Sequence, residues 1–425
     1  MENEREIISE LAPTHEKFIV SLAYTPTWLS SSNDETVKEG RILIANTHSP
    51  SDYKIWNEMI HETVIFFNEF DVEMYYEVWN EPDIYYWGEG IDSYLELYEE
   101  TALTIKSADP AAKVGGAVTS HWSNEIEPGR KSLNIELIEY AAENKLPLDF
   151  ISWHHYSTNP GKILEAKSAF ERAFMENNNG QIPEYVVTEW NVFFSDVRKS
   201  PFASAIMAEN LLGFYNAEVD IQTFSSWEDF HYYVDDYSGY GLITQQGDKK
   251  PQYYVHQIFD ILSRGQGLNV IEDEDLTMIV SQSSKDQNCY DLVMWNMIPH
   301  AEKEAIEYIL SNVPVDELTN YQNEENITEY IWKGKSIDGK RDQEFVVANL
   351  IHNEQYMDEL YKKNQEELNS KMRLGINIPD GENMEIMFNL AIKDSLNRKE
   401  IIQNNNQILF DLENNEVFYI NLCME

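Results

Sequence analysis

Two glutamates occupy similar positions at the ends of apolar, β-rich runs. Glu81 follows the run Met74–Trp79, and Glu189 follows the run Ile182–Val187. Hydrolysis of a glycosidic bond requires two carboxyl groups, because one protonates the leaving oxygen while the other attacks the sugar or activates water. An Asn-Glu-Pro tripeptide such as residues 80–82 is a weak signal alone. The second glutamate in a matching context makes glycosidic hydrolysis the chemistry that these residues favour.

The elements that would position these glutamates alternate between β-rich runs and helical stretches as far as about residue 265. The predicted strands are Phe18–Tyr24, Met74–Trp79, Lys113–Val118, Leu148–Tyr156, Tyr185–Glu189 and Ile221–Trp227. The predicted helices are Glu4–Leu11, Tyr53–Phe70, Ser93–Ala108, Ile135–Asn144, Gly161–Glu176 and Pro201–Tyr215. Strands and helices that alternate at this spacing are typical of βα units around a parallel sheet.

We therefore expect an α/β fold, with a (β/α)8 TIM-barrel-type domain at residues 1–265. Reactive groups of that fold lie at the C-terminal ends of several strands, as both glutamates would. Six strands are predicted where a closed barrel needs eight, so the first two βα units are missing from the pattern. We expect a gap between Phe18–Tyr24 and Ile221–Trp227, because six strands cannot tighten into the same closed ring.

The pattern changes in residues 266–425, where short alternating runs are separated by polar, Asn-rich turns. This texture predicts an antiparallel β-sandwich that serves as an accessory domain. One helix is predicted within it, at Asn353–Leu368. Its predicted strands are Thr277–Ser281, Tyr290–Trp295, Met372–Ile378, Met384–Ile392, Ile408–Leu412 and Val417–Leu422.

The charge of the chain argues against two classes of partner. Its 425 residues include 75 Asp and Glu against 31 Lys and Arg, which gives a formal net charge of -44. A surface this negative repels phosphate backbones and anionic lipids, so no nucleic-acid or membrane partner is expected. The N-terminus does not resemble a signal peptide, and no apolar run reaches transmembrane length. These features predict a cytoplasmic protein.

The chain carries two cysteines, Cys289 and Cys423. Two cysteines exclude a disulfide framework, and free buried thiols are the expected state. Neither has a metal-ligand spacing, and there is no Gly-rich phosphate loop and no Gly-x-Ser-x-Gly elbow. We expect no metal and no organic cofactor, because two carboxylates and water suffice for the chemistry above.

Several segments match a known family in order along the chain. They are Ala23–Pro26, Glu77–Asp83, Lys113–Gly116, Leu148–Tyr156, Thr188–Asn191, Ser225–Trp227, Gly241–Thr244 and Lys250–Tyr254. In these segments the chain resembles clan A glycoside hydrolases, and specifically family 39, which holds β-xylosidases and α-L-iduronidases. The resemblance covers nearly the whole chain, although it is fainter in the sandwich.

The resemblance implies a retaining mechanism with Glu81 as general acid/base and Glu189 as nucleophile. Such a mechanism needs Glu81 to hold a proton near neutral pH while Glu189 stays ionised. Asn80 matches the asparagine that hydrogen-bonds the 2-hydroxyl of the sugar. Trp227 matches the aromatic side chain that forms the floor of the sugar subsite, with a core role as the alternative.

The family also places a His-x-Tyr pair at the end of the strand that holds His154 and Tyr156. These two residues would share one face of the strand, while His155 points the other way. The resemblance implies that His154 binds a sugar hydroxyl and that Tyr156 donates a hydrogen bond to the nucleophile. A core histidine bonded to the backbone is the alternative for His154 and the expectation for His155. Tyr24, Trp87 and Trp190 are weaker candidates for the pocket walls, and Lys249 and Lys250 are expected to be solvated.

The substrate expected from these residues is a neutral β-glycoside, and a β-xyloside first. An iduronidase would need cationic groups in the pocket, and Arg198 lies nine residues beyond Glu189. Three alternatives remain open because of the missing strands: a truncated enzyme, one part of a split protein, or a non-catalytic sugar-binding barrel that acts as a sensor. A partner chain or a second copy of the chain would then cover the open barrel edge.

Overall fold

A computed structural model of the chain describes most of the α/β part and the strands of the C-terminal sheets. The described residues are 2–37, 42–123, 127, 129–157, 160–177, 183–191, 203–230, 239–273, 276–296, 371–378, 383–393, 395–404 and 407–424. The predicted helix at Asn353–Leu368, and Arg198, lie outside these residues.

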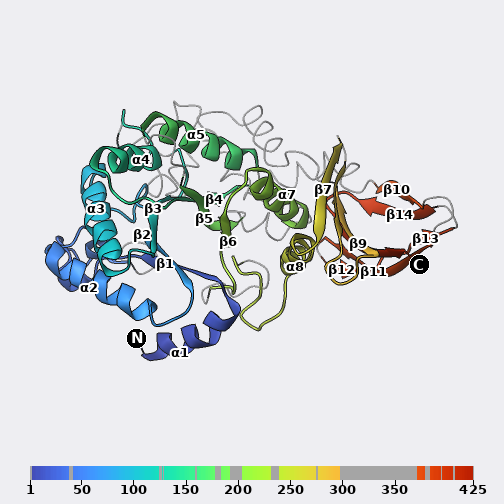
Figure 1. The fold of residues 1–425 in the computed structure, drawn as a ribbon, viewed down its shortest axis with the longest axis horizontal. Coiled ribbons are helices and arrows are strands. Elements are labelled where there is room, and N and C mark those ends of the chain that lie inside the picture. The colour runs from blue at the N-terminus through green and yellow to red at the C-terminus, as the bar shows by residue number, and fades with distance from the viewer. Residues whose placement is uncertain are drawn as a thin grey trace.

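Six parallel strands form one curled sheet in the order β1-β2-β3-β4-β5-β6 (Figure 1). This arrangement confirms the expected α/β class and the six predicted strands. Among the described strands, β1 and β6 are the two edges and do not pair with each other. The strands are β1 Lys17–Leu22, β2 Glu73–Val78, β3 Lys113–Thr119, β4 Phe150–Tyr156, β5 Glu184–Asn191 and β6 Ile221–Phe224.

Helices lie on the outer side of the curled sheet, as Figure 1 shows. Helix α2 illustrates how the sequence specifies them: the Asp52 side chain caps its N-terminus by accepting from the backbone of Lys54 and Ile55. Trp56, Ile60 and Val64 then recur at the helical period and are buried. The helices of this part are α1 Glu2–Leu11, α2 Tyr53–Phe67, α3 Ile91–Ala108, α4 Leu133–Asn144, α5 Gly161–Asn177, α7 Ala203–Asn216 and α8 Pro251–Ser263.

The inner side of the curl has its own small core. Tyr75, Phe150 and Val186, from β2, β4 and β5, pack together there, with Ile19 and Ile221 of the edge strands against them. Side chains alternate across each strand, so the neighbouring residues face the helices instead. Only every second residue of a regular strand can therefore face the interior of the curl.

Two strands break this alternation with a bulge close to their C-terminal ends. The register between β3 and β4 skips Val118, and the register between β5 and its neighbours skips a residue at Thr188. A bulge inserts one extra residue and re-aims the side chains that follow it. Thr188 and Glu189 consequently both turn to the inner side, although they are adjacent in sequence.

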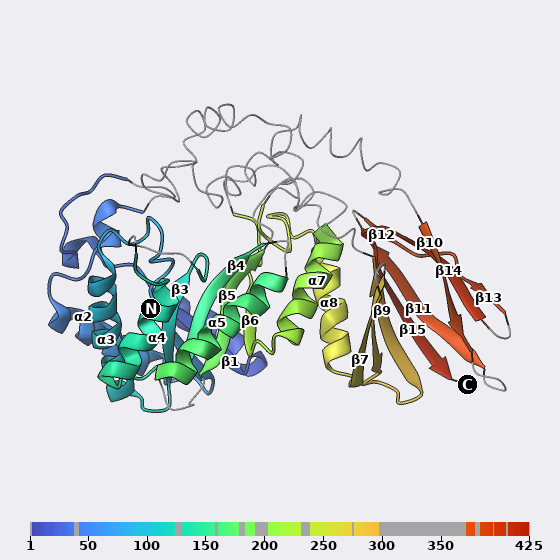
Figure 2. The same ribbon diagram turned by 90° about the horizontal axis from the view of Figure 1, so that it is seen from above.

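The C-terminal strands form two antiparallel sheets beside α7 and α8 (Figure 2). One has the order β12-β11-β15-β9-β8-β7 and the other the order β10-β14-β13. The six strands expected here are confirmed, whereas α8, β7, β12 and β13 were not predicted. The strands are β7 Gln266–Asp273, β8 Leu276–Gln282, β9 Cys289–Trp295, β10 Lys371–Asn377, β11 Met384–Ile392, β12 Leu396–Asn397, β13 Ile402–Gln403, β14 Gln407–Glu413 and β15 Val417–Met424.

The expectation of free thiols is wrong, because Cys289 and Cys423 form a disulfide. They are separated by 134 positions in the sequence, but they are direct partners in the register of β9 and β15. That pairing brings their Cα atoms to 3.9 Å. The bond ties the last strand of the chain to the middle of its sheet.

The disulfide bears on the compartment in which the protein works. In the described part of the chain, no helix has the length and apolar character needed to cross a bilayer. Disulfides persist mainly in oxidising compartments. The cytoplasmic location stays a prediction, and the Cys289–Cys423 bond is an observation against it.

Candidate active site

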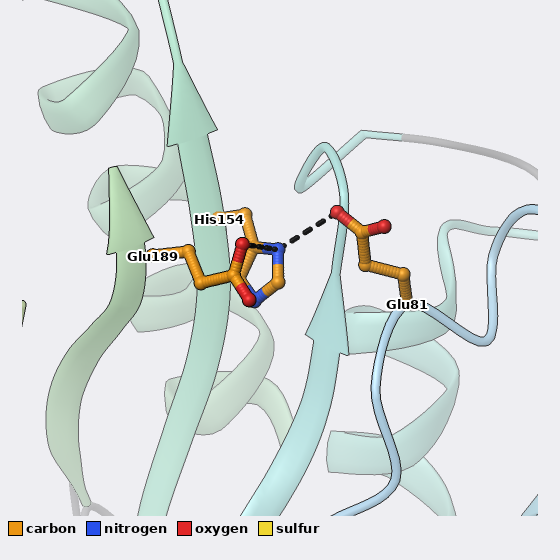
Figure 3. A group of neighbouring side chains, drawn as sticks. All are labelled: Glu81, His154 and Glu189. Carbon is orange, nitrogen blue, oxygen red and sulfur yellow. Dashed lines mark hydrogen bonds and ion pairs between the residues drawn. The ribbon is translucent and has the colours of Figure 1, made fainter. Parts of the chain in front are cut away.

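Glu81 and Glu189 meet at the C-terminal end of the curled sheet, as Figure 3 shows. Glu81 lies three residues beyond the end of β2, and Glu189 lies within β5. One carboxylate oxygen of each, together with a ring nitrogen of His154, lies within 4.8 Å of the others. Residues 108 positions apart are therefore brought into a single group of titratable side chains.

The backbone that carries Glu81 adopts an uncommon conformation. Trp79 and Glu81 both have positive φ, at 80° and 45°. Such a conformation costs about 1–3 kcal/mol for a non-glycine residue, so the surrounding structure must hold it. The Glu81 N–H donates to the carbonyl of the bulged Val118 at 3.1 Å, and the Ser120 N–H donates to Asp83 at 2.7 Å. These bonds tie the Glu81 loop to the end of β3.

His154 lies between the two glutamates. Its Nδ1 is 2.8 Å from Glu81 Oε1 and 3.6 Å from Glu189 Oε2, and its side chain is 1% exposed. Burial by itself would lower the pKa of His154, but the Glu189 and Glu81 carboxylates outweigh burial and raise it to about 9. The two carboxylates that His154 faces therefore favour its protonated form.

The two glutamates have different surroundings. The side chain of Glu81 is 14% exposed, and that of Glu189 is 37% exposed. Burial raises the pKa of Glu81, and the nearby Glu189 carboxylate adds to this, while the bond to His154 opposes it. The Tyr156 hydroxyl donates to Glu189 Oε2 at 2.6 Å. The site thus contains one drier carboxyl group and one that accepts a phenolic hydrogen bond.

Asn80 faces the same region through Tyr24. Its Nδ2 donates to the Tyr24 hydroxyl at 3.0 Å. The Tyr24 ring stacks on Tyr86 with centroids 5.7 Å apart and meets Trp79 edge-on at 5.4 Å. Burial raises the pKa of Tyr24, with the Glu81 and Glu189 charges among the further causes. Tyr24 therefore lies near the glutamate pair, as a wall residue would.

Trp227 is placed differently from the other predicted site residues. It follows the end of β6, and its side chain is 62% exposed. Its described ring contact is with Tyr253, at 6.0 Å between centroids. No described contact joins Trp227 to the glutamate pair, so the structure brings together Asn80, Glu81, His154, Tyr156 and Glu189 without it.

The model of the family described as glycosyl hydrolases family 39 matches residues 16–320. The chain belongs to glycoside hydrolase family 39. The prediction from the sequence motifs is thereby confirmed at the level of the family.

Curated relatives and solved structures agree with this family 39 assignment. The chain is 25% identical over 303 residues to a β-xylosidase of Caldicellulosiruptor saccharolyticus, a match that covers 64% of this chain and 58% of the relative. It is 25% identical over 352 residues to a β-xylosidase of Geobacillus stearothermophilus, covering 73% and 64%. The chain thus spans about 60% of the length of these relatives.

The fold is also similar to that of a monomeric β-xylosidase from Caulobacter crescentus. The TM-score is 0.64 at 16% sequence identity, and the match covers 95% of this chain and 80% of that one. At this identity the likeness concerns the fold, which is a barrel-type α/β domain followed by antiparallel sheets.

Two side chains named as minor wall candidates belong to the core of this family 39 chain instead. Trp190 is 1% exposed and packs against Phe214 of α7, and Trp87 is 3% exposed and packs against Trp79. His155 also faces the helices, as expected, and is buried. Its partner is the Asn210 side chain at 3.1 Å and not a backbone group, so that detail of the prediction is wrong.

The expectation that Lys250 is solvated is also wrong. Its side chain is 4% exposed, and its Nζ lies 2.6 Å from Asp229 Oδ1. Asp229 also accepts from the Gly241 N–H at 2.8 Å. A lysine four-carbon stem can be buried if its charge is paired, and the sequence alone does not show that the partner lies 21 residues upstream.

Two further residues near the pair were not identified from the sequence. Glu77 on β2 is 3% exposed and accepts from Thr188 Oγ1 at 2.8 Å. Burial raises the pKa of Glu77 to about 7. A charged residue inside the apolar run Met74–Trp79 was a signal for Glu77, because buried carboxylates need a reason. Thr188 gave no such signal.

The group of Glu81, His154 and Glu189 also has the composition of a metal site. Two carboxylate oxygens and an imidazole nitrogen are ligands that divalent transition metals accept. Within the described residues this is the group of potential ligands that comes close enough together. The expectation from the sequence, that the chemistry uses no metal, stays a prediction.

Proposed function

We propose that this chain works as a retaining glycoside hydrolase, with Glu189 as nucleophile and Glu81 as general acid/base. The observation that carries the proposal is the spacing of the pair. Double displacement needs carboxyl groups about 5–5.5 Å apart, whereas inversion needs about 6.5–9.5 Å to admit a water. The oxygens of Glu81 and Glu189 that face His154 are within 4.8 Å, which supports double displacement.

The different surroundings of the two glutamates support the division of roles. Glu81 is the drier group, and its pKa is raised by burial, as suits the residue that delivers a proton to the leaving oxygen. The proton is held by the hydrogen-bonded Glu81–His154 pair. Glu189 is more accessible, and the Tyr156 hydroxyl bonds to one of its oxygens, which leaves the other free to attack the anomeric carbon.

The second half of the reaction reverses these roles. After the leaving group departs, Glu81 is ionised and lies beside the bond between the sugar and Glu189. It can then take a proton from water as the water attacks the anomeric carbon, which releases Glu189. Asn80 is proposed to bind the 2-hydroxyl of the sugar, His154 and Tyr156 to line its subsite, and Trp227 to form the floor.

The proposed substrate is a β-xyloside. Two relatives named β-xylosidase support this choice, as does the neutral and aromatic character of the side chains around the pair, Tyr24, Asn80, Tyr86 and Tyr156. An exposed tryptophan such as Trp227 offers an apolar face on which a sugar ring can pack. No cofactor is part of the proposed mechanism.

The acid/base role is tested with Glu81→Ala and aryl β-xylosides of graded leaving-group ability. Substrates with good leaving groups need little protonation, so their first step should be nearly unchanged, while poor leaving groups should react at least about 100-fold more slowly. Azide should restore turnover by attacking in place of activated water. Glu143→Ala, at an exposed site on α4, is the matched control and should behave as the parent.

Three outcomes would overturn parts of this proposal. An equal loss on all leaving groups, without azide rescue, would contradict the acid/base role of Glu81. A parent chain that binds xylose in a calorimeter but hydrolyses no β-xyloside would favour the sugar-sensing alternative. Activity that appears only after a partner chain or a second copy covers the β1 and β6 edges would favour a split or oligomeric enzyme.

A further inference from the structure

The feature that carries a further inference is a direct bond between two strands that are not neighbours. Thr188 Oγ1 on β5 donates to Glu77 Oε1 on β2 at 2.8 Å. Strands β3 and β4 lie between them in the sheet. The bond therefore crosses the interior of the curl and does not follow the sheet.

The two partners are close in sequence to the two glutamates of the proposed reaction. Glu77 precedes Glu81 by four residues on the run that ends β2, and Thr188 immediately precedes Glu189. The same bulge in β5 lets Thr188 and Glu189 both face the interior. Any change in the distance between Glu77 and Thr188 must therefore be passed to Glu81 and Glu189.

We propose that the Glu77–Thr188 bond is a cross-sheet strut that sets the separation of the Glu81 and Glu189 carboxyl groups. Glu77 and Thr188 are positioning residues, since they act through the strands that carry the other two. This inference rests on the proposed function for its catalytic consequence, whereas its structural consequence does not depend on activity.

Burial makes this strut stiff. Glu77 is 3% exposed, so its carboxyl group has little water to replace a lost partner. Among the described strands, β1 and β6 do not pair with each other, so bonds that cross the curl add to the constraints on its curvature.

A second bond between the same two strands, further from the glutamate pair, serves as a control for the strut. The Tyr75 hydroxyl donates to Glu184 Oε2 at 2.7 Å, which again joins β2 to β5 across the curl. This second bond lies nearer the N-terminal ends of both strands: Tyr75 precedes Glu81 by six residues, and Glu184 precedes Glu189 by five. If bracing matters only for stability, the two bonds should behave alike.

The test compares Thr188→Val, Thr188→Ser and Tyr75→Phe in the full chain. Valine keeps the size of threonine and loses the donor, serine keeps the donor, and Tyr75→Phe removes the control bond. With 4-nitrophenyl β-xyloside, well below the unfolding temperature, kcat of Thr188→Val should fall by about 100-fold, the usual effect of a 1 Å misplacement. Thr188→Ser should stay within about threefold of the parent, and so should Tyr75→Phe, although it is less stable.

Crystal structures of the same variants make the test independent of activity. The strut predicts a longer Glu81–Glu189 separation in Thr188→Val and an unchanged one in Thr188→Ser and Tyr75→Phe. If Thr188→Val does not fold, Thr188→Cys replaces it, because a thiol is a weak donor of similar size.

An unchanged carboxyl separation in Thr188→Val would overturn the strut, as would equal losses of kcat in Thr188→Val and Tyr75→Phe. A parent chain that is inactive on β-xylosides, together with the predicted change in separation, would instead reject the proposed function and leave the strut intact.

Discussion

The backbone is irregular at the C-terminal end of the parallel sheet. It is regular where β9 and β15 pair in the sandwich. In the first region, Trp79, Glu81 and Val118 have positive φ, and bulges interrupt β3 and β5. In the second, β9 and β15 pair without a shift from Val417–Trp295 to Cys423–Cys289. The irregular region holds Glu81, His154 and Glu189, and the β9–β15 pair holds a disulfide and one buried carboxyl group, Asp291.

The difference between the two regions follows from what their side chains must do. Strands β9 and β15 bury apolar side chains and pair without a shift, although the β11–β15 and β7–β8 pairs of the same sheet each contain one. The sheet end must turn Glu81, His154 and Glu189 toward one point, which regular alternation would not allow. The C-terminal end of the parallel sheet tolerates strain and buried charge because the helices and the N-terminal parts of β1 to β6 are packed around it.

The largest effect is expected from the residue at the centre of the irregular region. Glu189→Gln should lower kcat/KM on an aryl β-xyloside by at least about 10³-fold, because an amide cannot form the covalent bond to the sugar. Its unfolding midpoint should stay near that of the parent. Glu143→Gln is the matched control and should keep full activity. Retention of a tenth or more of the activity in Glu189→Gln would remove it from the nucleophile role.

The buried Lys250–Asp229 pair tests whether charge burial near β6 is costly. Lys250→Met leaves Asp229 buried and unpaired, so the free energy of unfolding should fall by about 3–5 kcal/mol. The double variant Lys250→Met with Asp229→Leu removes both charges and should recover much of the loss. Urea unfolding measures both variants. A single variant as stable as the parent would show that the pair is not buried in solution.

The disulfide tests the regular region. Replacing Cys289 and Cys423 together by serine should lower the free energy of unfolding by about 2–5 kcal/mol, as removal of a native disulfide commonly does. The kcat/KM on β-xylosides should not change, since the bond is remote from the glutamates in the fold. A loss of activity in the folded double variant would show that the sandwich shapes the site.

The pH dependence of stability has a defined sign. His154 has a folded pKa of about 9 against an ordinary 6.5, so its stabilisation is complete below 6.5 and is lost as pH rises through 9. Glu77, at about 7 against an ordinary 4.5, loses its stabilisation at lower pH, as the pH rises from 4.5 through 7. The unfolding midpoint should therefore fall between pH 6.5 and 9.

His154→Gln is the control for this pH effect. It removes the group that titrates highest, so its midpoint should depend less on pH between 7 and 9 than that of the parent. Calorimetry at closely spaced pH values measures both proteins. A parent midpoint that rises over this window would contradict the raised pKa of His154.

The elements of the fold were predictable because their signals are local. Hydrophobic alternation located β1 to β6 to within a few residues, and helical periodicity located α2 and its neighbours. The order of the motifs gave the family, which in turn gave Glu81, Glu189, His154 and Tyr156, four residues that the structure brings together. The short strands β12 and β13 have only two residues each and carry too little pattern to be recognised.

The contacts that the sequence did not reveal depend on register and on long-range pairing. The disulfide follows from the pairing of β9 with β15, which a count of two cysteines cannot specify. The bond from Thr188 to Glu77 follows from one bulge, which changes which face a residue occupies. The prediction for Lys250 was wrong because a lysine beside another lysine is usually solvated. Its partner Asp229 lies 21 residues upstream, which the sequence pattern does not reveal.

The most direct test of double displacement at Glu189 is to trap the covalent intermediate on the full chain. A 2-deoxy-2-fluoro-β-xyloside with an activated leaving group slows both steps but slows hydrolysis of the intermediate more, so the sugar should accumulate on the protein. Peptide mass spectrometry should then find the fluoroxylosyl group on Glu189, and NMR of normal turnover should show β-xylose as the first product. A label on a different carboxylate, or α-xylose as the first product, would contradict double displacement by Glu81 and Glu189.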